Sequence, residues 1–375
     1  MKEVSYKELG EVIKRSYLTQ TSLMVYGGIG IGKSQIVLES AKEICREKKK
    51  KFVEWNKTTS KEKRELLNNP EDTFIFADVR SSLQDPTDLK GLPSYYDGVV
   101  EWKPQLLFKV LEDKRADGLI FFDELLNAPQ SVMTALYQLI LDRGIGEISL
   151  NDKIGIVCAG NKADEVGSVF DMPEPLANRL IHVELIVNSK DWVDYALKKE
   201  IDTDIISYIS WKPSRLYSFS KKNKDFTFAS PRSWFMCSRL IANINSNTMK
   251  EILISSSVGE GIGLEFMTFL KLKKKLDVDD LLKHPQKIKK ITKVDEKYAL
   301  LGAISEKYKQ NPKIMKGCIG ICKNLEPEYS ILLMRYLLNV FKSIKREEDD
   351  YIAKFGKEVL NNGGYEEIKK YQKYF

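Results

Sequence analysis

Short runs of consecutive apolar residues alternate with longer amphipathic stretches along the first half of the chain. Such runs are typical of strands that are buried on both faces of a parallel sheet, and apolar positions spaced three and four apart predict the helices between them. We interpret as strands residues 23–26, 74–79, 119–122, 154–159 and 181–187. The alternation predicts an α/β fold in which helices flank a parallel sheet.

The helices of this half are predicted from the same periodicity. The first, over residues 3–17, has Val4, Leu9, Val12, Ile13 and Leu18 on its apolar side. Further helices are expected at residues 35–46, 106–114 and 131–141. The lysine run at 48–51 is interpreted as an exposed helix end, since cations suit helix C-termini, and residues 54–72 as a polar surface loop.

Two segments are predicted to form β-hairpins that interrupt the α/β pattern. In residues 95–100, Asp97-Gly98 is a tight-turn signal between strand-like residues. In residues 143–152 we place the tip of the second hairpin at Asn151-Asp152.

From residue 191 onward the apolar runs of strand type stop and a helical region is predicted. Residues 252–270 are expected to form a helix despite three glycines, and residues 296–375 are expected to form three or four more. The fold class that we predict is therefore a parallel α/β domain followed by an all-helical lid and a helical C-terminal extension.

Residues 27–34 fit the pattern G-x-x-x-x-G-K-[ST] at every fixed position, between a predicted strand and a predicted helix. Glycines allow backbone N–H groups to surround a phosphate, and the positive end of the following helix faces the same anion. We expect Lys33 to reach the β- and γ-phosphates and the Ser34 hydroxyl to coordinate Mg²⁺. The predicted nucleotide-binding residues of this loop are Gly27, Gly28, Ile29, Gly30, Ile31, Gly32, Lys33 and Ser34.

Two carboxylates, Asp123 and Glu124, follow the apolar run 119–122 directly. Open α/β sheets keep their chemistry at the carboxyl ends of their strands, where these side chains are expected to lie. We expect Asp123 to hold Mg²⁺, mostly through water, and Glu124 to orient and polarise the attacking water. The alternative is that the pair caps the next helix.

Three further polar residues are candidates for a role in nucleotide binding or hydrolysis. Asn161 follows the strand at 154–159 and is expected to face the γ-phosphate, with a turn residue as the alternative. Arg179 stands at a helix end, where a surface salt bridge is the alternative. Arg232 follows Ser230-Pro231, a helix-start signature, and could be a plain helix-start residue.

The composition excludes several classes of protein. No run approaches the roughly 18 apolar residues of a membrane span, and the N-terminus has no signal-peptide apolar region, so a cytoplasmic protein is expected. Five scattered cysteines argue against a disulfide framework, and we expect Cys318 and Cys322 to pack in the core. The net charge of +7 comes from lysines spread along the whole chain, which favours a solvated surface over a nucleic-acid patch.

In their order and spacing these motifs resemble those of the AAA+ ATPases, and within them the MoxR-like group. The resemblance covers residues 20–270. Residues 27–34 match the Walker A motif and residues 119–124 match Walker B. Residues 85–93 look like the start of that group's helix-2 insert, and residues 123–129 are similar to its extended Walker B motif.

The resemblance also implies roles for single residues and an assembly. Asn161 matches sensor 1, Arg179 the arginine finger, and Arg232 sensor 2. The family implies a homo-hexameric ring with ATP and Mg²⁺ at each subunit interface, in which Arg179 acts on the site of the neighbouring subunit and the two hairpins face the pore or upper face. The implied domains are a nucleotide-binding α/β domain at 1–188, a helical lid at 189–275 and an extension at 276–375.

Three functions are compatible with these motifs. The first is a MoxR-type ATPase that remodels a separate client protein, for example one with a von Willebrand factor A domain. The second is a nucleic-acid motor, such as a McrB-type GTPase subunit or a helicase loader, although no DNA-binding module is visible. The third is a nucleotide-gated scaffold without turnover, which the intact Glu124 and Arg179 argue against.

Overall fold

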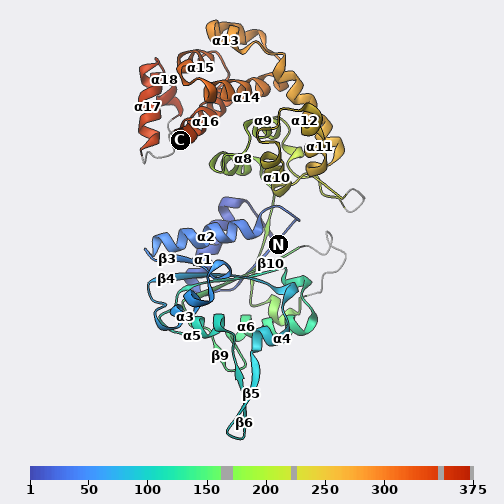
Figure 1. Ribbon diagram of the computed structural model, residues 1–375, viewed down its shortest axis with the longest axis vertical. Helices are drawn as coiled ribbons and strands as arrows, with labels where there is room; N and C mark the ends of the chain where they lie inside the picture. Colours follow the sequence, from blue (N-terminus) through green and yellow to red (C-terminus); the bar gives the residue numbers. More distant parts are fainter. Residues whose placement is uncertain (162–171, 221–225, 345–349, 372–375) are drawn as a thin grey trace. The chain divides into compact units, whose positions relative to one another are not determined.

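The computed structural model describes residues 1–161, 172–220, 226–344 and 350–371. The chain divides into two compact units, Met1–Val187 and Asn188–Phe375. The first unit is built around a sheet and the second is helical (Figure 1).

The first unit contains a seven-stranded sheet in which all neighbouring strands are parallel. In spatial order the strands are β1 (Lys2–Val4), β11 (Ile181–Leu185), β2 (Leu23–Gly27), β10 (Ile154–Gly160), β7 (Gly118–Asp123), β4 (Thr73–Arg80) and β3 (Lys51–Glu54). The predicted fold class is confirmed. The edge strands β1 and β3 were not predicted, because their three and four residues carry charged side chains that break the apolar runs.

Helices cover both faces of this sheet (Figure 1). On one face lie α1 (Tyr6–Thr19) and α2 (Lys33–Glu47); on the other lie α3 (Ser60–Asn68), α5 (Leu106–Glu112) and α6 (Gln130–Asp142). An apolar cluster joins the sheet to α5 and α6, and Ile75, Ile120 and Phe122 in this cluster are fully buried. This packing fixes the strand ends that carry the candidate site.

Capping side chains explain two differences from the predicted helices. Ser5 and Glu8 form a reciprocal capping box, so α1 begins at Tyr6. At the other end of this helix Leu18 is exposed and does not pack in the core. Thr59 and Glu62 form a second capping box, which starts α3 inside the segment that we predicted as a loop.

The lysine run after α2 also contacts a buried carboxylate, Asp117. Asp117, directly before β7, is buried. It accepts a hydrogen bond from the Tyr17 hydroxyl, and its Oδ2 forms ion pairs with Nζ of Lys48 and of Lys50, at 2.9 Å and 3.1 Å. Burial raises the pKa of Asp117, but the hydrogen bonds from Tyr17 and Lys48 outweigh it and hold the pKa below its ordinary value. The prediction of an exposed helix end is confirmed, since α2 ends at Glu47 and Lys48 and Lys49 are exposed. In addition, Lys48 and Lys50 pair with a buried carboxylate.

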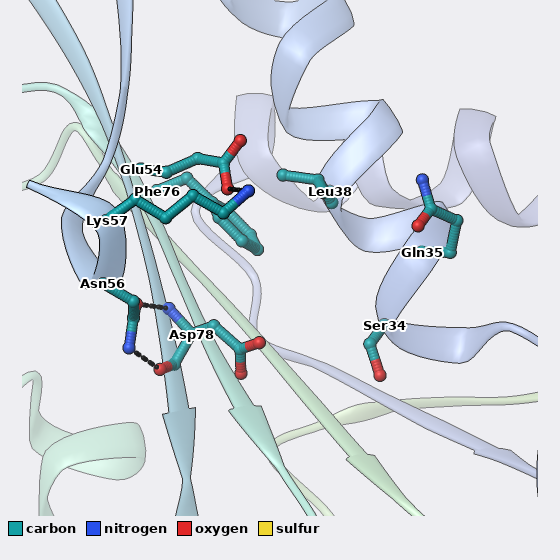
Figure 2. Close-up of a pocket in the computed structure, with 8 residues that line it drawn as sticks. All are labelled: Ser34, Gln35, Leu38, Glu54, Asn56, Lys57, Phe76 and Asp78. Atoms are coloured by element: carbon teal, nitrogen blue, oxygen red, sulfur yellow. Dashed lines mark hydrogen bonds and ion pairs between the residues drawn. The ribbon is translucent and has the colours of Figure 1, made fainter.

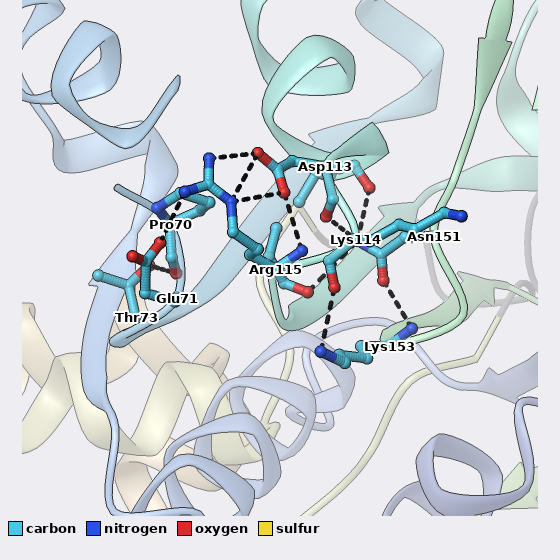
Figure 3. Close-up of polar contacts among 10 residues, drawn as sticks. Pro70, Glu71, Thr73, Asp113, Lys114, Arg115, Asn151 and Lys153 are labelled. Carbon is cyan, nitrogen blue, oxygen red and sulfur yellow. Dashed lines mark hydrogen bonds and ion pairs between the residues drawn. The ribbon is translucent and has the colours of Figure 1, made fainter. Parts of the chain in front are cut away.

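Both predicted hairpins are present, but one tip was misplaced. Strands β5 (Leu92–Tyr96) and β6 (Val99–Lys103) turn at Asp97-Gly98, as expected. The second hairpin pairs β8 (Gly144–Ile145) with β9 (Ile148–Ser149), so it turns before Asn151. The Asn151 amide is buried and donates to the carbonyls of Leu111 and Asp113, at 2.9 Å and 2.7 Å (Figure 3).

Gly118 gives a test of the sheet packing. A Cβ at this position would lie 2.2 Å from the carbonyl oxygen of Ile75 on β4. We expect Gly118→Ala to lower the free energy of unfolding by about 1–3 kcal/mol, because an overpacked core must shift its backbone. Gly10→Ala in α1 is the matched control: its Cβ would meet only Ser40 Oγ, at 3.7 Å, and alanine should stabilise the helix by about 0.5–1 kcal/mol. Urea unfolding measures both, and equal stability of the two variants would contradict the expectation.

The second unit is helical throughout the part that the structure describes, as predicted. Its α-helices are α8 (Ser189–Lys198), α9 (Thr203–Trp211), α10 (Pro231–Ile241), α11 (Asn247–Val258), α12 (Glu260–Lys274), α13 (Val278–Lys283), α14 (Val294–Gln310), α15 (Met315–Cys322), α16 (Pro327–Ile344), α17 (Tyr351–Asn361) and α18 (Tyr365–Tyr371). Cys318 and Cys322 are buried in this unit.

The predicted helix at 252–270 is in fact two helices. Gly259 has φ +92°, a left-handed backbone that separates α11 from α12. Among the described residues, five α-helices begin at or after Val294, more than expected. The helix α14 packs against α9, α12 and α16, so the proposed boundary between a lid and an extension stays a prediction.

None of the helices in the described ranges is both long and apolar enough to cross a membrane.

Candidate functional site

The glycine-rich loop joins β2 to α2 and has the backbone that a phosphate-binding loop needs. Gly30 and Gly32 have φ +74° and +100°, a region in which glycine is favoured because it has no Cβ. Gly32 is the N-cap of α2 and provides no side-chain hydrogen bond to the first turn. The first-turn N–H groups of α2 are thus left uncapped at the positive end of the helix dipole.

A residue outside the motif holds the loop. The Tyr6 hydroxyl, at the start of α1, donates a hydrogen bond to the carbonyl of Ile31. The Tyr6 ring also lies 3.6 Å from the place where a Cβ on Gly32 would stand. Sequence reasoning missed this contact, which joins positions 25 residues apart.

Lys33 is buried, 9% exposed, and hydrogen bonds join its ammonium group to the glycine loop and to Asn161. Nζ donates to the carbonyls of Gly27 and Gly28, at 2.7 Å and 2.9 Å, and to Oδ1 of Asn161, at 2.8 Å. Strands β2 and β10 are neighbours in the sheet, which places Asn161 beside the loop. The structure therefore brings together two residues that the sequence predicted separately.

Ser34 and Asp123 also meet. The Ser34 hydroxyl donates to Oδ2 of Asp123 at 2.7 Å, and Oδ1 of Asp123 accepts from the backbone N–H of Glu124 at 2.9 Å. A hydroxyl and a carboxylate are hard oxygen donors of the kind that Mg²⁺ prefers. Within the described residues no cluster of three or more His, Cys, Asp or Glu side chains could hold a metal. The Ser34 hydroxyl and the Asp123 carboxylate together fit Mg²⁺, since this ion is held by few protein ligands and keeps several waters.

Glu124 follows Asp123 in a left-handed backbone, with φ 56° and ψ 34°. Its carboxylate accepts a hydrogen bond from the hydroxyl of Ser82, a residue just after β4. Neither Glu124 as N-cap of the short turn Leu125–Asn127 nor Pro129 as N-cap of α6 makes a capping bond through its side chain. The alternative that the acidic pair serves as a helix cap is therefore wrong. Ser82 was not predicted as a site residue.

A cavity of about 260 Å³ opens beside Ser34 (Figure 2). Its residues come from α2, from β3 with the turn after it, and from β4: Ser34, Gln35, Leu38, Glu54, Asn56, Lys57, Phe76 and Asp78. Burial raises the pKa of the Asp78 carboxyl above its ordinary value, and the nearby negative charge of Asp123 adds to the rise.

Arg179 lies on the surface of the first unit. Its side chain is 60% exposed, and Nη1 is 3.8 Å from Oδ1 of Asp142, which is 66% exposed. An ion pair this open contributes at most about 1 kcal/mol, so it can be exchanged for another partner. The surface salt bridge that we considered is present, and the arginine-finger role stays a prediction.

Arg232 belongs to the second unit. Ser230 is the N-cap of α10 with Ser233 as its capping-box partner, and Pro231 occupies the first turn, which confirms the predicted helix start. Arg232 itself is exposed. Its role as a sensor of nucleotide stays a prediction.

Known proteins resemble the chain only at the level of structure. No family model matches it, and no curated protein matches it. The chain is similar to the ORC2 protein of Aeropyrum pernix in ADPNP and ADP complexes, at 14% identity over 91% of this chain and 93% of that one, with a TM-score of 0.39. It is also similar to the Thermotoga maritima RuvB Holliday junction branch migration motor (13% identity, 95% and 83% covered, TM-score 0.27) and to C. elegans PCH-2 (13%, 70% and 67%, 0.30). Similarity at this level does not assign a family.

Proposed function

We propose that the chain is a Mg²⁺-dependent ATPase of the AAA+ type. The observation that carries this proposal is the position of Lys33, whose ammonium lies between the carbonyls of the glycine loop and the amide of Asn161. Beside it, the Ser34 hydroxyl and the Asp123 carboxylate are 2.7 Å apart. A cation, an amide, a hydroxyl and a carboxylate thus converge at one edge of a parallel sheet, as phosphoryl transfer requires.

Each residue has a part in the hydrolysis of ATP. The loop N–H groups and Lys33 bind the β- and γ-phosphates, and Lys33 exchanges its bonds to the loop carbonyls for bonds to phosphate oxygens. Ser34 and Asp123 would hold Mg²⁺, and the bound cation would neutralise charge that develops on the phosphates. Glu124 orients the attacking water and accepts its proton, and Ser82 fixes the direction of that carboxylate. Asn161 donates its amide N–H to the γ-phosphate.

We further propose a MoxR-like ring, a homo-hexamer in which ATP lies at each subunit interface. The order of the motifs along the chain supports this proposal, and so does the exposure of Arg179, which leaves its guanidinium available to a neighbouring subunit. The hairpin β5–β6 exposes Tyr95, Tyr96, Val99 and Val100. It would contact a separate client protein, for example one with a von Willebrand factor A domain.

Mixing two inactive variants tests the shared site. Lys33→Ala removes the phosphate-binding cation and Arg179→Ala removes the cation supplied in trans, so each homo-oligomer should hydrolyse ATP slowly. In mixed rings some interfaces pair an intact loop with an intact arginine, and we expect ATPase activity to return, with a maximum near an equal ratio. An arginine finger contributes roughly 10³–10⁵ in rate, so even a small fraction of restored sites is measurable.

The control for the mixing experiment is a mixture of two double variants. One carries Lys33→Ala with Arg179→Ala, and the other carries Glu124→Gln with Arg179→Ala. This mixture has no complete interface and should stay inactive. If the Lys33→Ala and Arg179→Ala mixture is no more active than this control at any ratio, Arg179 does not act between subunits.

The nucleic-acid motor stays the alternative, supported only by the net charge of +7. A motor would show ATPase or GTPase stimulation by duplex or single-stranded DNA that falls steeply with salt, because phosphate contacts release counterions. We expect no such stimulation.

A further inference from the structure

The cavity beside Ser34 is lined by this proposed metal ligand and by a carboxylate, Asp78, that has no role in the proposed reaction. In Figure 2 the Asp78 side chain extends from β4 toward the α2 side of this cavity, where Ser34 stands. The other acid of the cavity, Glu54, is already paired with Lys57 and Lys42, at 2.5 Å and 3.7 Å.

The backbone of Asp78 is held by a side chain in place of a strand. Strand β3 ends at Glu54, which pairs with Phe76, so β4 continues beyond the reach of its neighbour. Asn56 substitutes for the missing strand: its amide donates to the carbonyl of Asp78 at 2.8 Å and accepts from the N–H of Asp78 at 3.0 Å (Figure 2). These two bonds fix the direction in which the Asp78 side chain leaves the sheet.

One oxygen of this carboxylate is buried. Among the residues that the structure describes, no donor reaches Oδ1 of Asp78. An ionised oxygen that is removed from water and left without a hydrogen bond is costly, so such an atom calls for a cation or a bound water.

The register of the sheet places this oxygen relative to Asp123. Asp78 on β4 lies opposite Phe121 on β7, two residues before Asp123, and the two carboxylates share a face of the sheet. Two residues along a strand span about 7 Å. This offset is too long for both carboxylates to ligate one Mg²⁺ directly, and it suits a cation that keeps water on the side of Asp78.

We propose that Asp78 is a second carboxylate of the Mg²⁺ site, which accepts hydrogen bonds from water bound to the cation that Ser34 and Asp123 hold. The proposal rests on the proposed function, since it assigns a positioning residue to the same site. Asn56 acts through Asp78, whose carboxylate it aims.

The test is direct titration with Mn²⁺, followed by electron paramagnetic resonance, in the presence of a non-hydrolysable ATP analogue. Removal of an outer-shell partner typically weakens metal binding about 10–100-fold, so Asp78→Asn should raise the dissociation constant for Mn²⁺ by at least ~10-fold. The affinity for the analogue without metal should stay the same or rise, because a negative charge near the phosphates is lost. A purely structural role of Asp78 would not separate these two affinities.

Glu54→Gln is the matched control, because it neutralises a carboxylate that lines the same cavity but is paired with lysines. It should bind Mn²⁺ as the unmodified protein does. Equal Mn²⁺ affinity in Asp78→Asn and Glu54→Gln would overturn the inference about Asp78. Absence of metal-dependent analogue binding in the unmodified protein would instead overturn the proposed function.

Asn56→Ala gives a second route if Asp78→Asn does not fold. This variant keeps the carboxylate but removes both bonds that hold its backbone. We expect a loss of Mn²⁺ affinity in the same direction and smaller than that of Asp78→Asn. Unchanged affinity in a folded Asn56→Ala protein would count against the aimed carboxylate.

Discussion

Lys33→Ala should weaken the binding of ATP by at least about 100-fold, because hydrogen bonds to charged groups contribute roughly 1.5–3 kcal/mol each and Lys33 is placed to make more than one. The loss has a second origin. Lys33 holds the carbonyls of Gly27 and Gly28, so its removal also frees the loop that presents the backbone N–H groups. Isothermal titration with ATP and Mg²⁺ measures the change.

The control for this variant is Lys61→Ala, which removes an exposed lysine from α3 and should leave ATP affinity unchanged. Thermal unfolding of both variants shows whether the loop alone is affected. A Lys33→Ala protein that is folded and binds ATP as tightly as the unmodified one would remove this loop from the site.

Glu124→Gln should bind ATP normally and hydrolyse it about 10²–10⁴ times more slowly, which is the range that a positioned general base contributes. Glutamine keeps the size of the side chain and can still accept the hydrogen bond from Ser82. It cannot accept a proton from the attacking water. Single-turnover hydrolysis of labelled ATP separates the chemical step from binding and product release.

Ser82→Ala provides the comparison for Glu124→Gln. It leaves the base in place but removes the bond that directs it, so its rate should fall between those of the unmodified protein and Glu124→Gln. Turnover at the unmodified rate in Glu124→Gln would exclude Glu124 from the reaction.

The central strands could be predicted from the sequence because burial on both faces leaves an unbroken apolar run, as in β7 and β10, where nearly every residue is buried. The edge strands β1 and β3 contain lysine and glutamate, and only their pairing with β11 and β4 makes them strands. The misplaced hairpin tip has a similar cause. Asparagine is common in turns, but the buried amide of Asn151 donates a hydrogen bond to the carbonyl of Leu111, 40 residues away in the chain.

The candidate site divides in the same way. The phosphate loop is one run of consecutive residues and the Asp123-Glu124 pair is another, so each could be predicted from a local sequence pattern. Asn161 could be predicted because it directly follows a strand. The contacts from Tyr6, Ser82 and Asn56 reach positions 25, 42 and 22 residues away. Serine, asparagine and tyrosine are common in any surface segment, and only the sheet order shows which of them meet the site.

The sheet order also determines when the site can form during synthesis. Strand β2 leads into the phosphate loop, yet its two neighbours are β10 and β11, the last strands of the first unit to be made. Among the described strands, the N-terminal strand β1 likewise pairs with β11 alone. A nascent chain that ends before Leu185 lacks a complete β11. This strand is a neighbour of β2, which leads into the loop, and it is the partner of β1. We therefore expect the ability to bind nucleotide to appear late and in one step as the ribosome completes this unit, and shorter nascent chains to depend on chaperones until then.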